Sequence, residues 1–378
     1  MTINPLKQVE NLGQSIWLDY IRRDLMVSGE LRRLIDNDGL RGMTSNPSLF
    51  EKAIVDGHDY DADIRSMSLE RRDAKAIYEA LTRRDVQMAA DEFRSLYNTL
   101  DAQDGYVSLE VDPHLAHDTN GTIEEAIRLW KEVDRPNVFI KVPATVEGLP
   151  AIKALISEGI NINSTLLFGL PRYRQVAEAY IGGIETRLAQ GKDVTHVASV
   201  ASFFLSRIDT LVDPLLEKIV EQGGDKAGVA RQVLGQVAIA SAKMAYQIYR
   251  EVFSGNRFTK LKGMGARAQR VLWASTGAKN PHYSDVKYID ALIGPDTINT
   301  VPVETLDAFR DHGNPKVRLK DGMEKAASVL EQLTGLGINI DSLTQQLEDD
   351  GVDKFNKPFD KLIGTLTESA SRHMKGTS

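Results

Sequence analysis

Short apolar segments recur along the chain, and amphipathic stretches separate them. The apolar segments are residues 15–20, 40–45, 105–111, 138–142, 160–168, 196–204, 271–276 and 297–303. Between them, stretches such as Thr122 to Val133, Pro171 to Leu188 and Ser206 to Glu221 show helical spacing of apolar residues. Strands that alternate with helices are typical of parallel βα units, and eight such units predict a closed (β/α)8 barrel of the α/β class. An open doubly wound sheet is the alternative, but no G-x-G-x-x-G turn follows the first strand.

Three regions exceed a minimal barrel. Residues 59–100 are predicted to be helical material inserted between the second and third strands. Residues 225–253 are predicted to form one long helix, because Val233, Val237 and Met244 share a face and Gly255 follows. The third region, from about 317 to 378, is helical and strongly charged. No linker rich in Pro, Ser or Gly separates these regions from the rest, so we predict a single domain over residues 1–378.

Composition and charge exclude several classes of function. The formal net charge is -7, and the basic residues are scattered without blocks, which argues against a nucleic-acid partner. The chain has no cysteine, and this excludes disulfides, thiolate metal sites and a cysteine nucleophile. No apolar run approaches the length of a membrane span, and residues 1–11 lack a basic segment followed by an apolar one. We therefore expect a cytoplasmic protein with no membrane partner, and the oligomeric state stays open.

Polar residues interrupt the apolar segments near the end of each predicted strand, where barrels gather their catalytic groups. These residues are Asp19, Asn46, Glu110, Lys141, Ser202 and Arg207. In the fifth segment, a period of two puts Asn161, Asn163 and Thr165 on one face. After the seventh segment comes a small, basic loop, residues 275–280, which contains Lys279 and lies where barrels commonly bind phosphate. Polar groups are therefore predicted to line one end of the barrel interior.

Lys141 is the most unusual of these residues, because it stands within the apolar run Val138 to Pro143. Desolvation disfavours an ammonium and frees an amine for Schiff-base chemistry on a carbonyl. The alternative is a strand whose lysine points to water and takes part in no reaction. The other polar residues at the same end of the barrel favour the catalytic interpretation.

Four segments of the chain combine into a pattern that identifies a family. They are Met43 to Ser48, Val138 to Pro143 with its lysine, Ile162 to Phe168, and Ser202 to Arg207. Together they resemble the transaldolases, which are Schiff-base aldolases of the pentose phosphate pathway, and the resemblance runs from about Trp17 to Val303. It implies a barrel with the Schiff-base lysine on the fourth strand, where the count of strands independently puts Lys141.

The resemblance also implies an activity. A transaldolase moves a dihydroxyacetone unit from a ketose phosphate, sedoheptulose 7-phosphate or fructose 6-phosphate, to an aldose phosphate acceptor. The acceptor is glyceraldehyde 3-phosphate or erythrose 4-phosphate, and the reaction needs no metal and no organic cofactor. The expected partners of the chain are therefore sugar phosphates.

The resemblance assigns catalytic roles to four positions. Lys141 would attack the C2 carbonyl of the ketose, and Asp19 would take the proton from the C4 hydroxyl as the C3–C4 bond breaks. The protonated imine accepts the electron pair, so the three-carbon unit is held as an enamine until an acceptor arrives. Glu110, with Thr165, would hold a water that moves protons as the carbinolamine forms and dehydrates.

Substrate binding involves a further set. Asn46, Asn163 and Ser202 would bind the hydroxyls of the three-carbon unit. Arg207 would bind the phosphate, because a guanidinium offers a fixed fork of donors. The second phosphate contact is expected at Lys279. Arg270 is the alternative, but it precedes the seventh strand and should lie at the opposite end of the barrel.

The chemistry raises a physical difficulty. A lysine attacks efficiently only when its pKa falls from about 10.4 toward ~7 to 8, which amounts to about 4 kcal/mol. Asp19 and Glu110 favour the ammonium, so burial against Phe139 and Val142 must outweigh them, or only a small amine fraction reacts. Alternatively, one of the carboxylates is itself protonated and coupled to the lysine.

Three other interpretations stay open or carry less weight. A simple aldolase would release free dihydroxyacetone to water, but the related small aldolases typically lack a glutamate at the position of Glu110, so this residue favours transfer. A non-catalytic phosphosugar-binding barrel would not need a buried amine. Asp112, His114, His117 and Asp118 complete no recognised metal-ligand spacing and are expected to be capping and surface groups.

Overall fold

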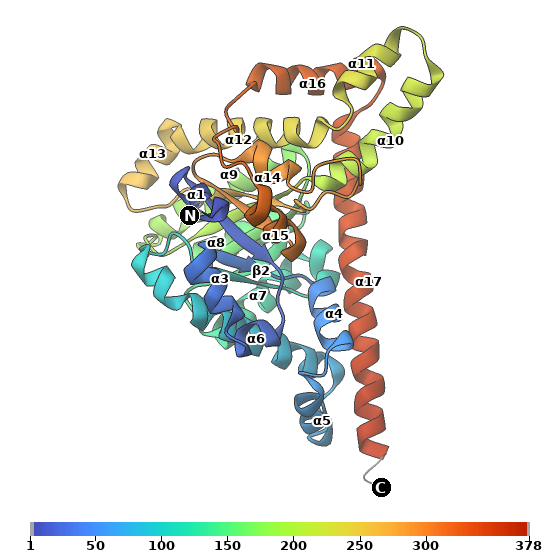
Figure 1. Ribbon diagram of the computed structural model, residues 1–378. Helices are drawn as coiled ribbons and strands as arrows, with labels where there is room; N and C mark the ends of the chain where they lie inside the picture. Colours follow the sequence, from blue (N-terminus) through green and yellow to red (C-terminus); the bar gives the residue numbers. More distant parts are fainter. Residues whose placement is uncertain (1–3, 376–378) are drawn as a thin grey trace.

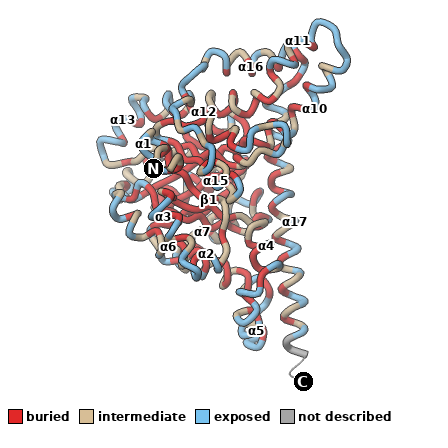
Figure 2. The backbone as a smooth tube through the Cα atoms, viewed as in Figure 1, coloured by how far each residue is buried: buried red, intermediate tan, exposed pale blue. Residues whose placement is uncertain are grey.

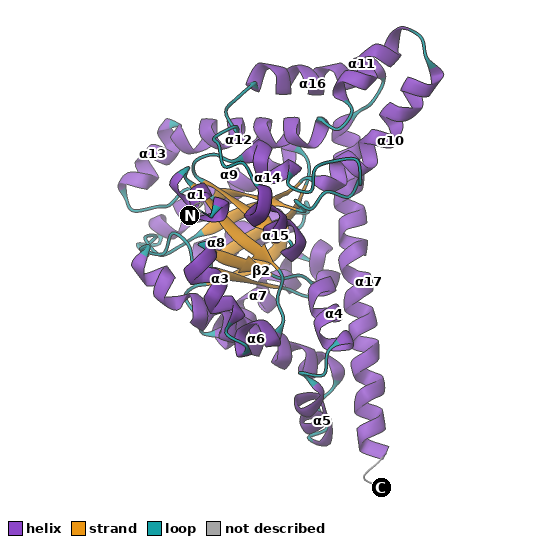
Figure 3. Ribbon diagram, in the orientation of Figure 1, coloured by secondary structure: helices purple, strands orange, loops and turns teal. Residues whose placement is uncertain are grey.

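The structure is a computed structural model that describes residues 4–375. Eight parallel strands close into a barrel in the order β1 to β8, and β8 pairs with β1. The strands are β1 (Gln14–Asp19), β2 (Gly42–Thr44), β3 (Tyr106–Glu110), β4 (Val138–Pro143), β5 (Ile162–Leu167), β6 (Ser199–Phe204), β7 (Arg270–Ala274) and β8 (Thr297–Val301). Each overlaps one of the eight predicted segments, and helices surround the barrel (Figure 3). The prediction of a (β/α)8 barrel is confirmed.

Helices connect the strands and extend the barrel. The first half of the chain contains α1 (Pro5–Asn11), α2 (Arg23–Val27), α3 (Glu30–Asp38), α4 (Pro47–Asp56), α5 (Asp61–Leu69), α6 (Ala74–Thr99), η1 (Pro113–His117), α7 (Thr119–Val133), α8 (Gly148–Glu158) and α9 (Leu170–Ala189). The second half contains α10 (Ser206–Gln222), α11 (Asp225–Val233), α12 (Val237–Ser254), α13 (Asn256–Gly263), α14 (Lys287–Leu292), α15 (Val303–His312), α16 (Met323–Leu336) and α17 (Ile340–Lys375). None of the helices within residues 4–375 is long and apolar enough to cross a membrane.

The prediction of one long helix over residues 225–253 is wrong, because the segment forms two helices, α11 and α12. Gly235 lies between them with a φ of +69°, a left-handed conformation that favours glycine. Two carboxylates of α10 satisfy backbone N–H groups at the break. Asp213 accepts from the N–H of Gly235 at 2.9 Å, and Asp209 accepts from that of Ala238 at 2.8 Å. These side chains act as caps from another helix, so the apolar face alone did not reveal the break.

The interior of the barrel changes from aromatic to polar along its axis. Near the N-terminal ends of the strands, the ring of Phe139 stacks on Tyr106 at 4.3 Å and on Trp17 at 6.1 Å. Gly42 makes room for this stack, since a Cβ at that position would lie 2.5 Å from the indole of Trp17. Toward the C-terminal ends, the register pairs Glu110 with Lys141. The aromatic stack therefore closes one end of the barrel beneath a polar layer.

The helix α17 crosses the other end. It contacts β5 and η1, which follows β3, together with α4, α5 and α6, and it runs along one side of the molecule in Figure 1. Phe355, Phe359 and Leu362 of this helix are buried against the barrel, while its outer face is exposed (Figure 2). The close approach shows at Gly351, where a Cβ would lie 3.1 Å from Leu166. The last helix of the chain thus covers the polar layer.

Candidate active site

Lys141 points into the barrel from β4 and is only 4% exposed. Its Nζ donates to the carbonyl oxygen of Ser45 at 3.1 Å and lies 3.6 Å from Oε1 of Glu110. The ring of Phe355 covers it, with its centroid 5.4 Å from Nζ. The interpretation in which this lysine points to water does not fit this geometry, because the amine is enclosed by strand ends and α17.

Glu110, the last residue of β3, is a buried carboxyl group whose proton is easily gained or lost near neutral pH. Within the described residues, neither of its oxygens has a hydrogen-bond partner. Burial raises the pKa of Glu110 to about 7, although the charge of Lys141 opposes the shift. A carboxyl group with such a pKa next to an amine is suited to general acid–base work at neutral pH.

Asp19, the last residue of β1, lies within reach of three cations. Its Oδ1 accepts from the hydroxyl of Thr44 at 2.8 Å. Burial raises the pKa of Asp19, and the charges of Lys141, Lys279 and Arg207 oppose this rise together with the Thr44 hydrogen bond. The structure therefore brings Asp19 together with the predicted nucleophile and with both predicted phosphate ligands.

Three polar side chains form a connected chain across the barrel interior. The hydroxyl of Ser202 donates to Oδ1 of Asn163 at 2.6 Å, and Nδ2 of Asn163 donates to Oγ of Ser108 at 3.1 Å. Asn163 pairs with Lys141 in the register of β4 and β5. The predicted inward face of the fifth strand is confirmed, because Thr165 pairs with Pro143, two positions beyond Lys141. The buried hydroxyl of Thr165 has no hydrogen-bond partner among residues 4–375, and it is available to bind substrate or solvent.

Asn46 and Arg207 stand at two helix starts that face the same end of the barrel. Asn46 is the N-cap of α4, and its Oδ1 accepts from the N–H of Leu49 at 3.1 Å, which leaves its amide NH2 for a ligand. Arg207 is the second residue of α10, and its Nη1 is buried with no partner among the described residues. Burial lowers the pKa of Arg207, and the charge of Asp19 opposes this. A half-buried guanidinium at a helix N-terminus is suited to binding an anion.

The two candidates for a second phosphate ligand lie at opposite ends of the barrel. Lys279 is exposed in the loop after β7, and its charge acts on the pKa of Asp19. Arg270 begins β7, where its guanidinium donates to Asp104 at 3.1 Å and to Ser15 at 2.7 Å. Arg270 therefore lies at the opposite end of β7 from the site. Lys279 stays the predicted ligand.

Phe355 is the main residue that sequence reasoning missed. Apolar residues recur along 340–375 at helical spacing, and this signal predicts a packed helix. The contact of Phe355 with Lys141 joins residues 214 positions apart, which no local pattern reveals. The backbone carbonyl of Ser45 and the hydroxyl of Thr44 were likewise not assigned, although both lie in the segment 43–48 that carried the resemblance.

The four residues considered as a metal cluster have other partners. Asp112 accepts from Lys75, His114 contacts Asp360, and His117 contacts Glu147. Asp118 caps the start of α7. Across the part of the chain that the structure describes, no three His, Cys, Asp or Glu side chains gather in a group that could hold a metal ion.

Comparisons with known proteins are consistent with this arrangement. The model of the family described as Transaldolase/Fructose-6-phosphate aldolase matches residues 16–366. A protein named Transaldolase from Trichodesmium erythraeum is 47% identical over 376 residues, which covers 98% of this chain and 99% of that protein. Transaldolase 2 from Nostoc sp. PCC 7120 is 45% identical over 371 residues, covering 97% of each chain. Transaldolase from Mycolicibacterium smegmatis is 45% identical over 365 residues, covering 96% of this chain and 97% of that protein.

Proposed function

The chain belongs to the transaldolase/fructose-6-phosphate aldolase family and is an enzyme of the transaldolase kind. From this premise we propose that it transfers a dihydroxyacetone unit between sugar phosphates of the pentose phosphate pathway, in the cytoplasm, through a Schiff base on Lys141. The observation that carries the proposal is the enclosed amine of Lys141, 3.6 Å from a glutamate whose pKa is about 7.

The first step forms the imine. Glu110 accepts a proton from the Lys141 ammonium, and the free amine attacks C2 of sedoheptulose 7-phosphate or fructose 6-phosphate. The carbinolamine that results must lose its hydroxyl as water, which requires a proton at the departing oxygen. Glu110 and the unpartnered hydroxyl of Thr165 face this region and can deliver that proton through a bound water.

The second step cleaves the carbon chain. Asp19 removes the proton from the C4 hydroxyl, the C3–C4 bond breaks, and its electron pair moves into the protonated imine to give an enamine. An aldose phosphate leaves with the new carbonyl. The enamine carbon then attacks the aldehyde of glyceraldehyde 3-phosphate or erythrose 4-phosphate, Asp19 returns the proton, and water releases the new ketose from Lys141.

Binding groups position both substrates. Asn163 and Ser202 are linked by a 2.6 Å hydrogen bond on the inner face and would bind the hydroxyls of the three-carbon unit together with the free NH2 of Asn46. Arg207 and Lys279, whose charges both act on Asp19, would bind the phosphate at the far end of the sugar. The proposed chemistry uses only side chains of this protein, without a metal or an organic cofactor.

Covalent trapping tests the proposal. The protein is incubated with fructose 6-phosphate, reduced with borohydride and digested, and the peptide that contains Lys141 is examined by mass spectrometry. We expect a three-carbon adduct on Lys141 and no adduct on the Lys141→Met variant. An unmodified wild-type chain, under conditions that label a known Schiff-base aldolase, would overturn the mechanism.

A second measurement separates transfer from simple aldol cleavage. With fructose 6-phosphate and erythrose 4-phosphate present together, a transferase forms sedoheptulose 7-phosphate and releases little free dihydroxyacetone. Glu110 and the apolar cover by Phe355 favour this outcome, because the cover limits access of water to the intermediate. Release of dihydroxyacetone at a rate that ignores the acceptor would instead show an aldolase.

A further inference from the structure

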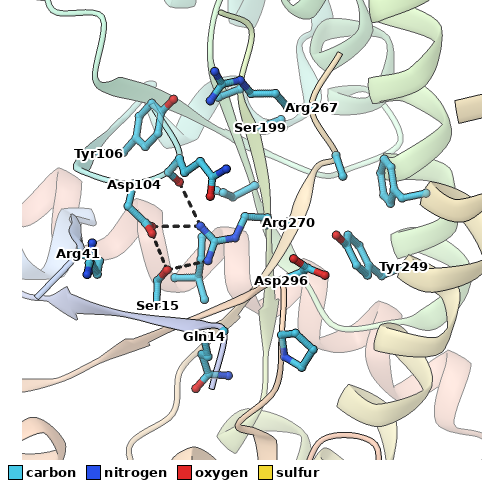
Figure 4. A pocket seen from close by; sticks show the side chains of 18 of the residues that line it. Gln14, Ser15, Arg41, Asp104, Tyr106, Ser199, Tyr249, Arg267, Arg270 and Asp296 are labelled. Atoms are coloured by element: carbon cyan, nitrogen blue, oxygen red, sulfur yellow. Dashed lines mark hydrogen bonds and ion pairs between the residues drawn. The ribbon is translucent and has the colours of Figure 1, made fainter. Parts of the chain in front are cut away.

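A large pocket lies at the end of the barrel opposite to Lys141. It has a volume of about 880 Å³ and is formed by the N-terminal ends of β1, β6, β7 and β8 together with α12 and α13 (Figure 4). Trp17, Tyr106 and Phe139 line its floor, and this same stack separates it from the polar layer. The proposed catalytic residues therefore do not reach it.

Arg270, on the floor of this pocket, is bound to neighbouring groups of the protein. The guanidinium of Arg270 makes four hydrogen bonds, to Asp104 at 3.1 Å, to Ser15 at 2.7 Å, and to the backbone carbonyls of Gln103 and Thr297 at 3.1 and 2.9 Å. Figure 4 shows this cluster at the centre of the pocket. This network occupies both Nη groups of Arg270 and seals the bottom of the barrel.

Two further arginines that line the pocket are also bound to neighbouring groups of the protein. Arg41 pairs with Glu10, and Arg267 donates to the backbone carbonyl of Asp101 at 2.6 Å and lies 3.4 Å from its carboxylate. With Asp104 bound to Arg270, three of the four carboxylates that line the pocket are used by internal pairs. The fourth, Asp296, is exposed, and its side chain has no partner among the described residues.

The wall of the pocket that α12 and α13 form differs from the floor in the partners of its cationic side chains. Arg250 on α12, Lys262 on α13 and Lys320 in the segment before α16 line the pocket and are exposed. Within residues 4–375, no hydrogen bond or ion pair occupies these three side chains. Among the described residues, three cationic side chains without a partner therefore line the pocket together with one carboxylate without a partner. The formal net charge of the chain is -7. This local excess of positive charge is opposite in sign to the net charge of the whole chain.

The helices that form this wall exceed what a barrel needs between β6 and β7, which supports a role for the wall beyond packing. A minimal βα unit needs one helix between β6 and β7, whereas this chain has four there, α10 to α13. The last two, α12 and α13, carry Arg250 and Lys262, and the tyrosines Tyr246 and Tyr249 of α12 complete the same side of the pocket. Figure 4 shows Tyr249 beside Asp296, so a hydroxyl and a carboxylate lie next to the basic wall.

We infer that this pocket is a second ligand site, which binds a small phosphate-bearing metabolite of at least two negative charges. Lysine and arginine side chains are the usual ligands of phosphate oxygens, and the number of uncommitted cations matches such a charge. The volume falls within the range of about 300–1,000 Å³ that is usual for small-molecule pockets. Asp296 and Tyr249 offer an acceptor and a hydroxyl for the organic body of the ligand.

Calorimetric titration of the full chain tests the site, with inorganic pyrophosphate and adenosine diphosphate as probes. We expect saturable binding of at least one probe by the wild type, and a loss of affinity of tenfold or more in Arg250→Ala/Lys262→Ala. Lys320→Ala should weaken binding by a smaller factor. The ratio of the two probe affinities shows whether phosphate alone is recognised or whether the organic body contributes.

Two controls assign the binding to this pocket. Arg207→Ala disables the phosphate position at the other end of the barrel, so it removes any binding of the probes there and should leave their binding to this pocket intact. Lys226→Ala/Arg231→Ala removes two exposed cations of α11 outside the pocket and should also bind as the wild type does. Absence of binding by the wild type, unchanged binding by Arg250→Ala/Lys262→Ala, or loss of binding in Arg207→Ala would each overturn the inference.

Discussion

The amine of Lys141 and the carboxyl group of Glu110 lie 3.6 Å apart, and both side chains are at most 5% exposed. Burying a carboxylate and an ammonium together is unfavourable unless their mutual attraction offsets the desolvation of both. Burial raises the pKa of Glu110 to about 7, so this carboxyl group can gain or lose a proton at neutral pH beside the amine. Glu110 is therefore suited to exchanging protons at the amine during imine formation.

The first prediction concerns Glu110→Gln. The amide has the shape of the acid but cannot take the proton from Lys141, so we expect transfer to fall by about 10²–10⁴-fold, the range for loss of a general acid–base group. Borohydride labelling of Lys141 with fructose 6-phosphate should slow in parallel. The pH profile of kcat/KM should also lose an ionisation near 7. A variant that keeps the wild-type profile would remove Glu110 from the proton transfers.

The same residue predicts a pH dependence of stability. The pKa of Glu110 rises from 4.5 to about 7 on folding, so between these values the native state binds more protons than the unfolded state. The stabilising effect of the neutral acid is then fully present below about pH 4.5 and is lost as the pH rises through about 7. Urea unfolding at pH 5 and pH 8 should therefore show that Glu110→Gln gains stability relative to the wild type at the higher pH. An equal difference at both pH values would contradict the raised pKa.

Asp19→Asn should separate imine formation from bond cleavage. The amide cannot remove the C4 proton, so the ketose stays whole on Lys141, and turnover should drop by at least about 10²-fold. Mass spectrometry after reduction should find a six-carbon phosphorylated adduct, where the wild type gives a three-carbon one. If the variant still yields the three-carbon adduct at the wild-type rate, another group acts as the base.

Phe355→Ala tests the cover that α17 places over the amine. Loss of a buried phenylalanine should destabilise the fold by about 3–5 kcal/mol and admit water to Lys141. We expect a several-fold rise in the ratio of free dihydroxyacetone to transfer product. Phe359→Ala is the matched control, because Phe359 is buried on the same helix but packs on Tyr78 with ring centroids 5.2 Å apart. It should cost similar stability and leave the product ratio unchanged; an equal change in both variants would assign the effect to general loosening.

Gly42→Ala tests the aromatic stack at the closed end of the barrel. The added Cβ would lie 2.5 Å from the indole of Trp17, which is fully buried and cannot move aside freely. Overpacking of this kind destabilises by about 1–3 kcal/mol, measured as a lower urea midpoint. Gly228→Ala serves as the comparison, because Gly228 lies within α11 with nothing within 4 Å of the added Cβ. That change should stabilise by about 0.5–1 kcal/mol, as for alanine in a helix interior.

The sequence by itself determined the barrel and the inner face of its strands. Both follow from local rules, since a strand alternates its side chains with a period of two and consecutive parallel strands pair in order. From these rules alone, Asp19, Glu110, Lys141 and Thr165 fall at the same end of the interior, and the register of the strands agrees. Arg270 was placed at the opposite end for the same reason.

Contacts between distant segments were decided only by the tertiary structure. The break at Gly235 depends on two carboxylates that lie 22 and 29 residues from the N–H groups they cap. The cover of Lys141 by Phe355 and the pKa of Glu110 depend on how α17 and the strand ends exclude water. The basic wall of the pocket at the opposite end of the barrel likewise joins α12, α13 and Lys320. Periodicity reports which face of a segment is buried, but not what buries it, because packing partners are chosen by shape and desolvation across the whole fold.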